Sequence, residues 1–256
     1  MTTSELAYDL EGRGAPIVFL HGLTFDRRTW RPIIDRVGHE AQSLSIDLPA
    51  HGESPGDPMP LDQVAAEVHD LVTSLGLDDP IVVGHSMSGA IAFIYASTYS
   101  TRAVVTVDSG PEVQPFAEIV QQLEPALRSP GFAQAWTQFE TTLGLDRIPE
   151  PVLSLVLETH EVQQDVVLGY WEQLFQTGPA ELQAWVDEIV ESIQVPCLGI
   201  FGRSLTGGER ERFERLPDVQ LEEWEGAGHF VHLVDPDRFV TRLRQFVGTV
   251  EPAFAV

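Results

Sequence analysis

A strand-turn-helix pattern surrounds Ser86 near the middle of the N-terminal half. The apolar run Ile81–Val83 leads directly into Gly84–Gly89 (GHSMSG), and an apolar stretch of helical composition follows. This order predicts a buried strand, a sharp turn and then a helix near 88–99. Small residues around the serine let the strand and helix backbones approach closely. A serine at such a turn projects its hydroxyl above the N–H groups that begin the next helix, which makes it a candidate nucleophile.

Other motifs accompany this turn. His21–Leu23 closes an earlier apolar run, Asp47–Ser54 (DLPAHGES) closes another, and Gly226–Phe230 (GAGHF) precedes Asp235–Phe239 (DPDRF) near the C-terminus. Their order and separations resemble those of the α/β-hydrolase superfamily across nearly the whole chain. A mild departure is Ser88, where glycine is commoner. The resemblance implies the α/β class and the α/β-hydrolase fold, a mostly parallel sheet flanked by helices, with serine as the nucleophile.

Short β-like runs alternate with helix-like stretches, which is typical of a mostly parallel sheet covered on both faces. Strands are expected near 5–10, 16–21, 42–47, 80–85, 103–108, 196–202 and 219–224, and helices near 29–37, 61–75, 88–99, 207–215 and 236–249. Residues 111–193 interrupt this alternation of strands and helices, because they contain several helical stretches separated by prolines and no clear strand. The resemblance implies that they form an inserted helical cap over a core of residues 1–110 and 194–256. The alternative is a longer helical connection packed on the sheet.

Serine needs a base within hydrogen-bond reach to act as a nucleophile at neutral pH. His229 is the candidate, because it lies in a glycine-rich loop after the last expected strand. His232, three residues further along, is its nearest rival. A carboxylate must then set the tautomer of the histidine and stabilise its imidazolium form.

The position of this acid is less clearly marked. The superfamily usually places it after the strand expected near 196–202, where this sequence has no carboxylate before Glu209. A minority of the superfamily uses the preceding strand, and here Asp108 stands at the tip of that strand. Asp108 is therefore the expected acid, with Glu209 and Glu211 as alternatives. A purely structural interpretation of Asp108, as a cap for the turn that follows, stays open.

Two backbone amides are expected to form an oxyanion hole, those of Leu23 and Met87. Gly22, directly before Leu23, permits the backbone there to approach the site closely. Met87 is the first residue of the helix expected after Ser86. The substrate pocket is expected to include residues near these motifs and aromatic residues of the cap, namely His21, Phe25, Phe116, Trp136 and Trp171.

The composition narrows the possible partners. The 256-residue chain has a formal net charge of −24, and all 15 of its lysine-plus-arginine residues are arginine. Nucleic acids and anionic membranes carry charge of the same sign, so neither is expected as a partner. The absence of lysine excludes Schiff-base chemistry, a pyridoxal-phosphate anchor and a P-loop lysine. No metal-ligand spacing and no dinucleotide-binding turn occurs, so no metal and no cofactor are expected.

The apolar runs, the N-terminal residues and the single cysteine bear on where the protein is located and how it assembles. No run approaches the roughly 18 apolar residues of a membrane span. Residues 1–5 lack the basic and apolar regions of a signal peptide. The single cysteine, Cys197, lies in an apolar run and is interpreted as a buried strand residue. A cytoplasmic monomer or homodimer that acts on a small molecule is expected.

These features predict a cofactor-free serine hydrolase, a carboxylic ester hydrolase. It would cleave an ester, thioester or lactone of a small, mostly apolar substrate through an acyl-enzyme. One alternative keeps the triad but uses it for carbon–carbon bond hydrolysis, acyl transfer or another non-esterase reaction, since one fold hosts many chemistries. A further alternative is a non-catalytic, ligand-binding member of the fold.

Overall fold

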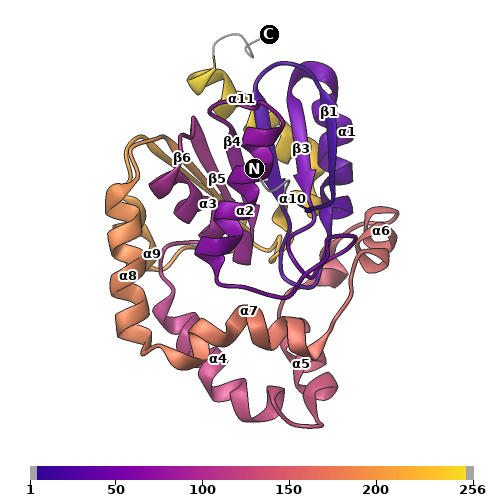
Figure 1. Cartoon of the computed structure of the whole chain (residues 1–256), viewed down its shortest axis with the longest axis vertical. Coiled ribbons are helices and arrows are strands. Elements are labelled where there is room, and N and C mark those ends of the chain that lie inside the picture. The colour runs from indigo at the N-terminus through magenta and orange to yellow at the C-terminus, as the bar shows by residue number, and fades with distance from the viewer. Residues whose placement is uncertain (1–4, 252–256) are drawn as a thin grey trace.

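A computed structural model describes residues 5–251 of the chain. Within this range the chain forms a seven-stranded sheet in the order β1-β3-β2-β4-β5-β6-β7 (Figure 1). The strands are β1 (Tyr8–Gly12), β2 (Pro16–Leu20), β3 (Gln42–Ile46), β4 (Ile81–His85), β5 (Ala103–Val107), β6 (Cys197–Phe201) and β7 (Val219–Glu223). Most of the segment used for the signal-peptide expectation, residues 1–4, lies outside the described residues.

The pairing of the strands is parallel except at one edge. β1 pairs with β3 in antiparallel register, with Leu10 opposite Leu44. The other neighbouring pairs are parallel, and parallel strands need crossover connections, which helices supply. All residues of β4, β5 and β6 are buried, as expected for parallel strands covered on both faces. The predicted α/β-hydrolase fold, with its mostly parallel sheet, is confirmed.

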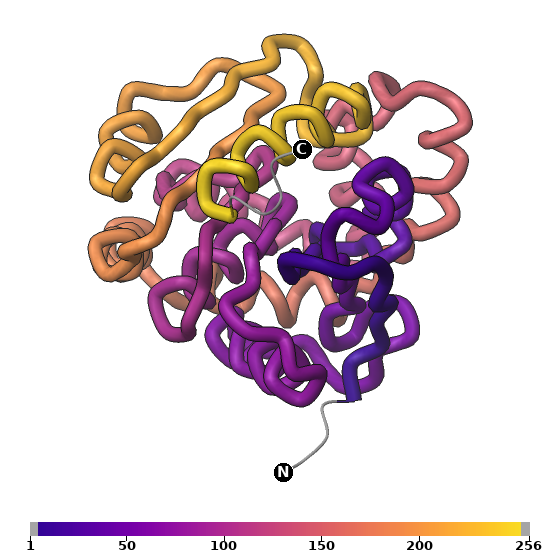
Figure 2. The backbone as a smooth tube through the Cα atoms, turned by 90° about the horizontal axis from the view of Figure 1, so that it is seen from above, coloured from indigo at the N-terminus to yellow at the C-terminus, as the bar shows by residue number. Residues whose placement is uncertain are grey.

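Helices pack on both faces of this sheet: α1 (Arg31–Val37), α2 (Leu61–Ser74), α3 (Met87–Thr98), α9 (Gly207–Phe213), α10 (Val231–Val234) and α11 (Pro236–Val250). α1 and α11 contact each other on one side of the strands, and α2 and α3 contact each other on the opposite side (Figure 2). Successive strand residues point to opposite faces. Val104 of β5 therefore packs in the cluster with α2 and α3, whereas Val105 packs in the cluster with α1 and α11.

The connection from β5 to β6 holds further helices: α4 (Gln114–Leu127), α5 (Phe132–Glu140), α6 (Val152–Glu158), α7 (Gln164–Gln176) and α8 (Pro179–Ser192). We call residues 111–193 the helical insert. In Figure 1, α4, α5 and α7 lie beyond one end of the sheet, and α8 runs along its side. This is the carboxyl end of the parallel strands, because Ser86 and Asp108 share a cavity with residues of α4 and α7. The division into a core and a cap stays a prediction.

The elements expected from the sequence are present. Each of the seven expected strands is found, with the largest shift at β1, which begins at Tyr8. The helix expected near 29–37 is split into a 3₁₀ helix at Arg27–Trp30 and α1, with proline at the start of α1. Among residues 5–251, no helix combines the length and the apolar character needed to cross a bilayer.

Candidate active site

Ser86 occupies the turn between β4, which ends at His85, and α3, which begins at Met87. Its backbone has φ 56° and ψ −123°, a positive-φ conformation that residues other than glycine rarely adopt. Gly84 makes the turn possible, because a Cβ at that position would lie 2.0 Å from the carbonyl oxygen of Ser88. The predicted strand-to-helix turn is therefore present, and its serine lines the main cavity.

Ser88 links this turn to the loop after β2. Its side chain is fully buried, and its Oγ donates a hydrogen bond to the carbonyl oxygen of His21. The neighbouring Gly89 packs so tightly that an added Cβ would lie 2.4 Å from the Cβ of Ser109. Serine is accommodated where glycine is commoner because its hydroxyl has an acceptor within reach.

His229 and Asp108 meet although they are 121 residues apart in the sequence. Nδ1 of His229 lies 2.7 Å from Oδ2 of Asp108. The other carboxylate oxygen, Oδ1, accepts a hydrogen bond of 3.1 Å from the backbone N–H of Gly202. The backbone N–H of Asp108 in turn donates to the carbonyl oxygen of Ile200 at 2.8 Å. Because the carboxylate occupies Nδ1, Nε2 is the ring nitrogen left to exchange a proton with another group.

The loop before His229 packs against the end of β6. A Cβ at Gly202 would lie 1.8 Å from the carbonyl oxygen of Gly228, and the N–H of Gly228 donates to the carbonyl of Gly202 at 3.1 Å. The helical insert contributes the carbonyl oxygen of Leu143, which accepts a hydrogen bond of 3.1 Å from the N–H of His229. The backbone of the histidine is thus held from the sheet and from the insert.

The alternative triad residues have other partners. Glu209 forms a bidentate ion pair with Arg203, with N–O distances of 2.8 and 2.5 Å. The side chain of Glu211 is 73% exposed. His232 is buried against Trp30, with ring centroids 4.6 Å apart, and burial lowers its pKa to about 3. Asp108 is therefore the carboxylate, among those considered from the sequence, that contacts His229.

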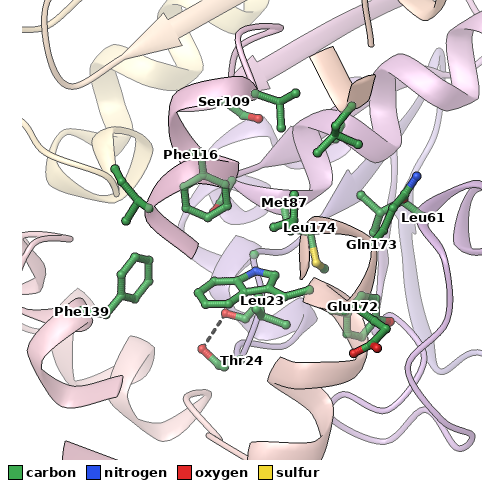
Figure 3. A pocket seen from close by; sticks show the side chains of 18 of the residues that line it. Leu23, Thr24, Leu61, Met87, Ser109, Phe116, Phe139, Glu172, Gln173 and Leu174 are labelled. Atoms are coloured by element: carbon green, nitrogen blue, oxygen red, sulfur yellow. Dashed lines mark hydrogen bonds between the residues drawn. The ribbon is translucent and has the colours of Figure 1, made fainter. Parts of the chain in front are cut away.

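The loop after β2 approaches the serine closely. A Cβ at Gly22 would lie 3.4 Å from the Cβ of Ser86, so the missing side chain permits this approach. Leu23 and Met87 both line the cavity that contains Ser86 (Figure 3). Within residues 5–251, neither of their backbone N–H groups donates a hydrogen bond to the protein. These two amides can therefore meet a developing oxyanion.

Two neutral histidines, His21 and His51, hold the loop after β2 through hydrogen bonds to backbone groups. Nε2 of His21 accepts a hydrogen bond of 3.0 Å from the N–H of Leu48, and Nε2 of His51 accepts one of 3.2 Å from the N–H of Thr24. In each ring Nδ1 lies within 3.0 Å of a backbone carbonyl oxygen, so the proton sits on Nδ1. Burial lowers the pKa of His21 to about 4 and that of His51 to about 3, which keeps both rings neutral.

The expected pocket residues divide into two groups. Phe25, Phe116, Trp136 and Trp171 line the cavity. His21 does not, and that expectation is corrected. Its side chain is fully buried, and both ring nitrogens are used in the backbone hydrogen bonds described above. Proximity to Gly22 in sequence suggested a pocket position, but the ring turns into the protein.

The cavity has a volume of about 1290 Å³. Much of its wall was not foreseen, above all the face of α8 that carries Leu182, Trp185, Val186 and Ile189. The spacing of apolar residues in this segment indicates an apolar helix face. This spacing does not indicate whether the apolar face borders a cavity or packs in the core. Among residues 5–251, no group of three or more His, Cys, Asp and Glu side chains is arranged to hold a metal ion.

Comparisons with known proteins agree with this architecture. A curated relative, the 2-succinyl-6-hydroxy-2,4-cyclohexadiene-1-carboxylate synthase of Serratia proteamaculans (strain 568), is 25% identical over 90% of this chain and 92% of its own. Solved structures with a similar fold include Est816, described as an N-acyl homoserine lactone degrading enzyme. It has a TM-score of 0.73 and 23% identity, and the match covers 94% of this chain and 96% of that chain. The enol-lactonase from Burkholderia xenovorans LB400 has a TM-score of 0.73 and 20% identity, with the same coverage of 94% and 96%.

At these identities the likeness to the solved structures shows a shared fold. The model of the alpha/beta hydrolase family matches residues 17–242, most of the chain. This range includes the serine turn, the strand tip with Asp108 and the loop with His229. The chain belongs to the alpha/beta hydrolase family.

Proposed function

We propose that this protein is a serine hydrolase that cleaves an ester, thioester or lactone without a cofactor. The observation that carries the proposal is the 2.7 Å contact between Nδ1 of His229 and Oδ2 of Asp108, in the same cavity as Ser86. A carboxylate in this position fixes the tautomer whose Nε2 accepts a proton, and it stabilises the imidazolium. The two proteins of similar fold, an N-acyl homoserine lactone degrading enzyme and an enol-lactonase, support an acyl-transfer reaction.

In the proposed reaction, Nε2 of His229 takes the hydroxyl proton as Oγ of Ser86 attacks the substrate carbonyl carbon. The carbonyl π electrons move to oxygen, and the amides of Leu23 and Met87 donate hydrogen bonds to that oxyanion. When the carbonyl re-forms, the bond to the leaving group breaks, and His229 gives the proton to the departing alcohol or thiol. Water then loses a proton to His229 and attacks the acyl-enzyme. Ser86 regains the proton as the carboxylic acid leaves.

We extend the proposal to the helical insert, which would act as a cap over this site. The insert contributes Phe116 and Trp171 to the cavity wall. It also supplies the carbonyl of Leu143 that holds the backbone of His229. Apolar side chains above the reacting carbonyl would limit water there, which strengthens the hydrogen bonds to the oxyanion.

The test compares two serines of one cavity, Ser86 and Ser109. Hydrolysis of p-nitrophenyl butyrate is measured for the wild type, Ser86→Ala and Ser109→Ala. We expect Ser86→Ala to lower kcat by on the order of 10⁶, as loss of a catalytic serine does elsewhere. Ser109→Ala should stay close to the wild type. Equal losses in both variants, or a wild type inert toward esters, thioesters and lactones, would reject the function.

A further inference from the structure

We propose that the cavity binds a long, uncharged acyl chain, octanoyl or longer, and discriminates against chains that end in a carboxylate. This inference rests on the proposed hydrolase function and names the substrate class of the same site. It also revises the expectation of a small substrate that the sequence suggested. The size of the cavity, its lining and the partners of its charged residues carry the argument.

The size of the cavity favours a long chain. Its volume of about 1290 Å³ exceeds the roughly 300–1,000 Å³ that is typical of sites for drug-sized ligands. An acetyl or butyryl group would fill a small part of this space. Each further methylene that leaves water raises affinity about fourfold, so a chain that follows the wall gains binding at every step.

Most of the wall around the serine is apolar. In Figure 3, Leu23 and Met87 lie at the centre of the view, with Phe116 and Phe139 on one side and Leu61 on the other. The lining continues along α3, α4 and α8 through Phe93, Ile94, Ile119, Leu123, Trp185, Val186 and Ile189. Phe116 and Ile119 line the cavity and are 38% and 51% exposed. The wall therefore offers large apolar side-chain surface that an acyl chain could cover.

The carboxylates in the wall are already engaged with the protein. Asp108 contacts His229, and Glu172 forms a 2.7 Å ion pair with Arg128, which lies outside the lining. The hydrogen bond from Arg128 lowers the pKa of Glu172 and keeps it ionised. Among the described residues, the lining carboxylates are Asp108, Glu112, Glu172 and Glu209. Glu112 pairs with Arg212, which also lies outside the lining, so the charges of these carboxylates are largely balanced by the protein.

Among the described lining residues, Arg203 is the one arginine. Its guanidinium donates to both carboxylate oxygens of Glu209, at 2.8 and 2.5 Å, and to the carbonyl of Ser204 at 3.1 Å. Glu209 is itself fixed, because it accepts a hydrogen bond of 2.8 Å from the N–H of Thr206 at the start of α9. The charge of the one lining arginine is therefore already balanced by Glu209, and a substrate carboxylate buried without a partner of its own is strongly disfavoured.

The kinetic test uses esters with one leaving group and two kinds of chain. p-Nitrophenyl butyrate, p-nitrophenyl octanoate and mono-p-nitrophenyl suberate are compared at pH 8. The suberate ester has the same chain length as the octanoate ester but ends in a carboxylate. We expect kcat/KM for the octanoate ester to exceed that for the butyrate ester by on the order of 10². We expect it to exceed that for the suberate ester by more than about tenfold. A preference for butyrate, or equal values for octanoate and suberate, would overturn the inference.

A binding measurement separates this inference from the catalytic proposal. Ser86→Ala is titrated with methyl octanoate and with monomethyl suberate by calorimetry at pH 8. We expect methyl octanoate to bind more than about tenfold tighter than the suberate monoester, whose far end carries a carboxylate. If it does while the wild type hydrolyses no ester, thioester or lactone, the catalytic proposal fails and the cavity assignment stands. If esters are hydrolysed but methyl octanoate binds no tighter than the suberate monoester, the cavity assignment fails alone.

Two tryptophan substitutions on α8 test the position of the chain. Val186 lines the cavity, whereas Glu188 is exposed on the same helix and does not line it. We expect Val186→Trp to lower kcat/KM for p-nitrophenyl octanoate about tenfold or more, by removing space for two or more methylenes. Activity on the butyrate ester should change little. Glu188→Trp should leave kcat/KM unchanged for both the octanoate and the butyrate ester. The same loss on both esters in Val186→Trp, with an unchanged Tm, would contradict the placement.

Discussion

The two nitrogens of the His229 ring have different surroundings. Nδ1 lies 2.7 Å from Asp108, whose second carboxylate oxygen is held by the backbone N–H of Gly202. The carboxylate therefore cannot rotate without losing a hydrogen bond, and the imidazole is oriented through it. Within the described residues Nε2 makes no hydrogen bond, so it is the ring nitrogen available for the proposed proton transfer. Orientation and proton transfer are thus assigned to opposite sides of one ring.

Replacing Asp108 with asparagine tests this division at the residue scale. The amide can donate to Nδ1, which favours the tautomer whose Nε2 carries the proton and cannot act as a base. We expect Asp108→Asn to lower kcat by on the order of 10³–10⁴, measured with p-nitrophenyl octanoate. Glu209→Gln serves as the control. A large loss in Glu209→Gln and little loss in Asp108→Asn would show that the acid is assigned to the wrong residue.

At the scale of elements, the loop after β2 is held from the core and from the helical insert. Its Thr24 N–H donates to Nε2 of His51, and the Thr24 carbonyl oxygen accepts a hydrogen bond of 2.9 Å from the N–H of Glu161. The next residue, Phe25, stacks on His160 with ring centroids 4.7 Å apart. Because Leu23 lies in this loop, the placement of its amide depends on these contacts.

His51→Ala removes one of these contacts and leaves the N–H of Thr24 without an acceptor. A buried donor without a partner costs about 1–3 kcal/mol, so we expect the free energy of unfolding to fall by that amount in urea titrations. We also expect kcat to fall by up to about 10², with KM nearly unchanged, because a displaced Leu23 amide donates less well to the oxyanion. This is the lower end of the range for complete loss of one oxyanion donor. His51→Gln, which keeps an acceptor, should recover part of kcat. A higher KM at constant kcat would contradict the assignment.

The turn at the end of β4 provides a second test at this scale. A methyl group at Gly84 would lie 2.0 Å from the carbonyl oxygen of Ser88, which belongs to the helix backbone and cannot move alone. We expect Gly84→Ala to lower the free energy of unfolding by about 3 kcal/mol or more and to displace Ser86. Gly178→Ala is the control, because its Cβ would meet nothing within 4 Å. Equal stability of the two variants would show that the turn is looser than described.

At the scale of the whole molecule, buried histidines make stability depend on pH. Burial lowers the pKa of His21 to about 4, of His51 to about 3 and of His232 to about 3, and it lowers that of His85 well below 6.5. These rings stay neutral in the folded protein. The unfolded chain binds protons on them once the pH falls below about 6.5. Their contribution to stability is therefore complete above that value and is lost as the pH falls toward the folded pKa values.

We expect the free energy of unfolding to fall steeply between pH 6.5 and 5. Each buried histidine contributes a slope of up to about 1.4 kcal/mol per pH unit, so the four together contribute up to about 5 kcal/mol per pH unit. His232→Phe should reduce this slope by the contribution of one histidine, because it removes one buried ring that is neutral in the folded protein. The substitution should leave the fold intact, because Nδ1 of His232 has no hydrogen-bond partner to lose. Urea titrations at several pH values measure both quantities. A flat profile in the wild type, or an unchanged slope in His232→Phe, would contradict this account.

Local patterns in the sequence predicted most elements outside the helical insert, whereas the fold as a whole was predicted from the resemblance to the α/β-hydrolase superfamily. The strands and the helices that flank them follow from apolar runs and helical periodicity, and the serine turn follows from the small residues Gly84 and Ser88. Asp108 could be proposed because it stands directly after a buried strand, where the carboxyl ends of parallel strands gather. Each of these inferences uses residues that are close in the sequence.

Features that depend on distant contacts were not accessible in this way. His21 and Gly22 are adjacent, yet one turns into the protein and the other approaches Ser86, because Leu48 and Ser88 fix the loop between them. Glu209 pairs with Arg203 only through the folding of the loop between them, which no local pattern indicates. The same is true of the α8 wall, because periodicity identifies an apolar face but not what covers it.

The proposed function requires that Ser86 becomes acylated during turnover. Intact-mass analysis after reaction with a fluorophosphonate, followed by peptide mapping, tests it most directly. We expect one adduct per chain, located on the peptide that contains Ser86, and none in Ser86→Ala. An adduct on any other residue, or labelling of Ser86→Ala equal to that of the wild type, would contradict the account.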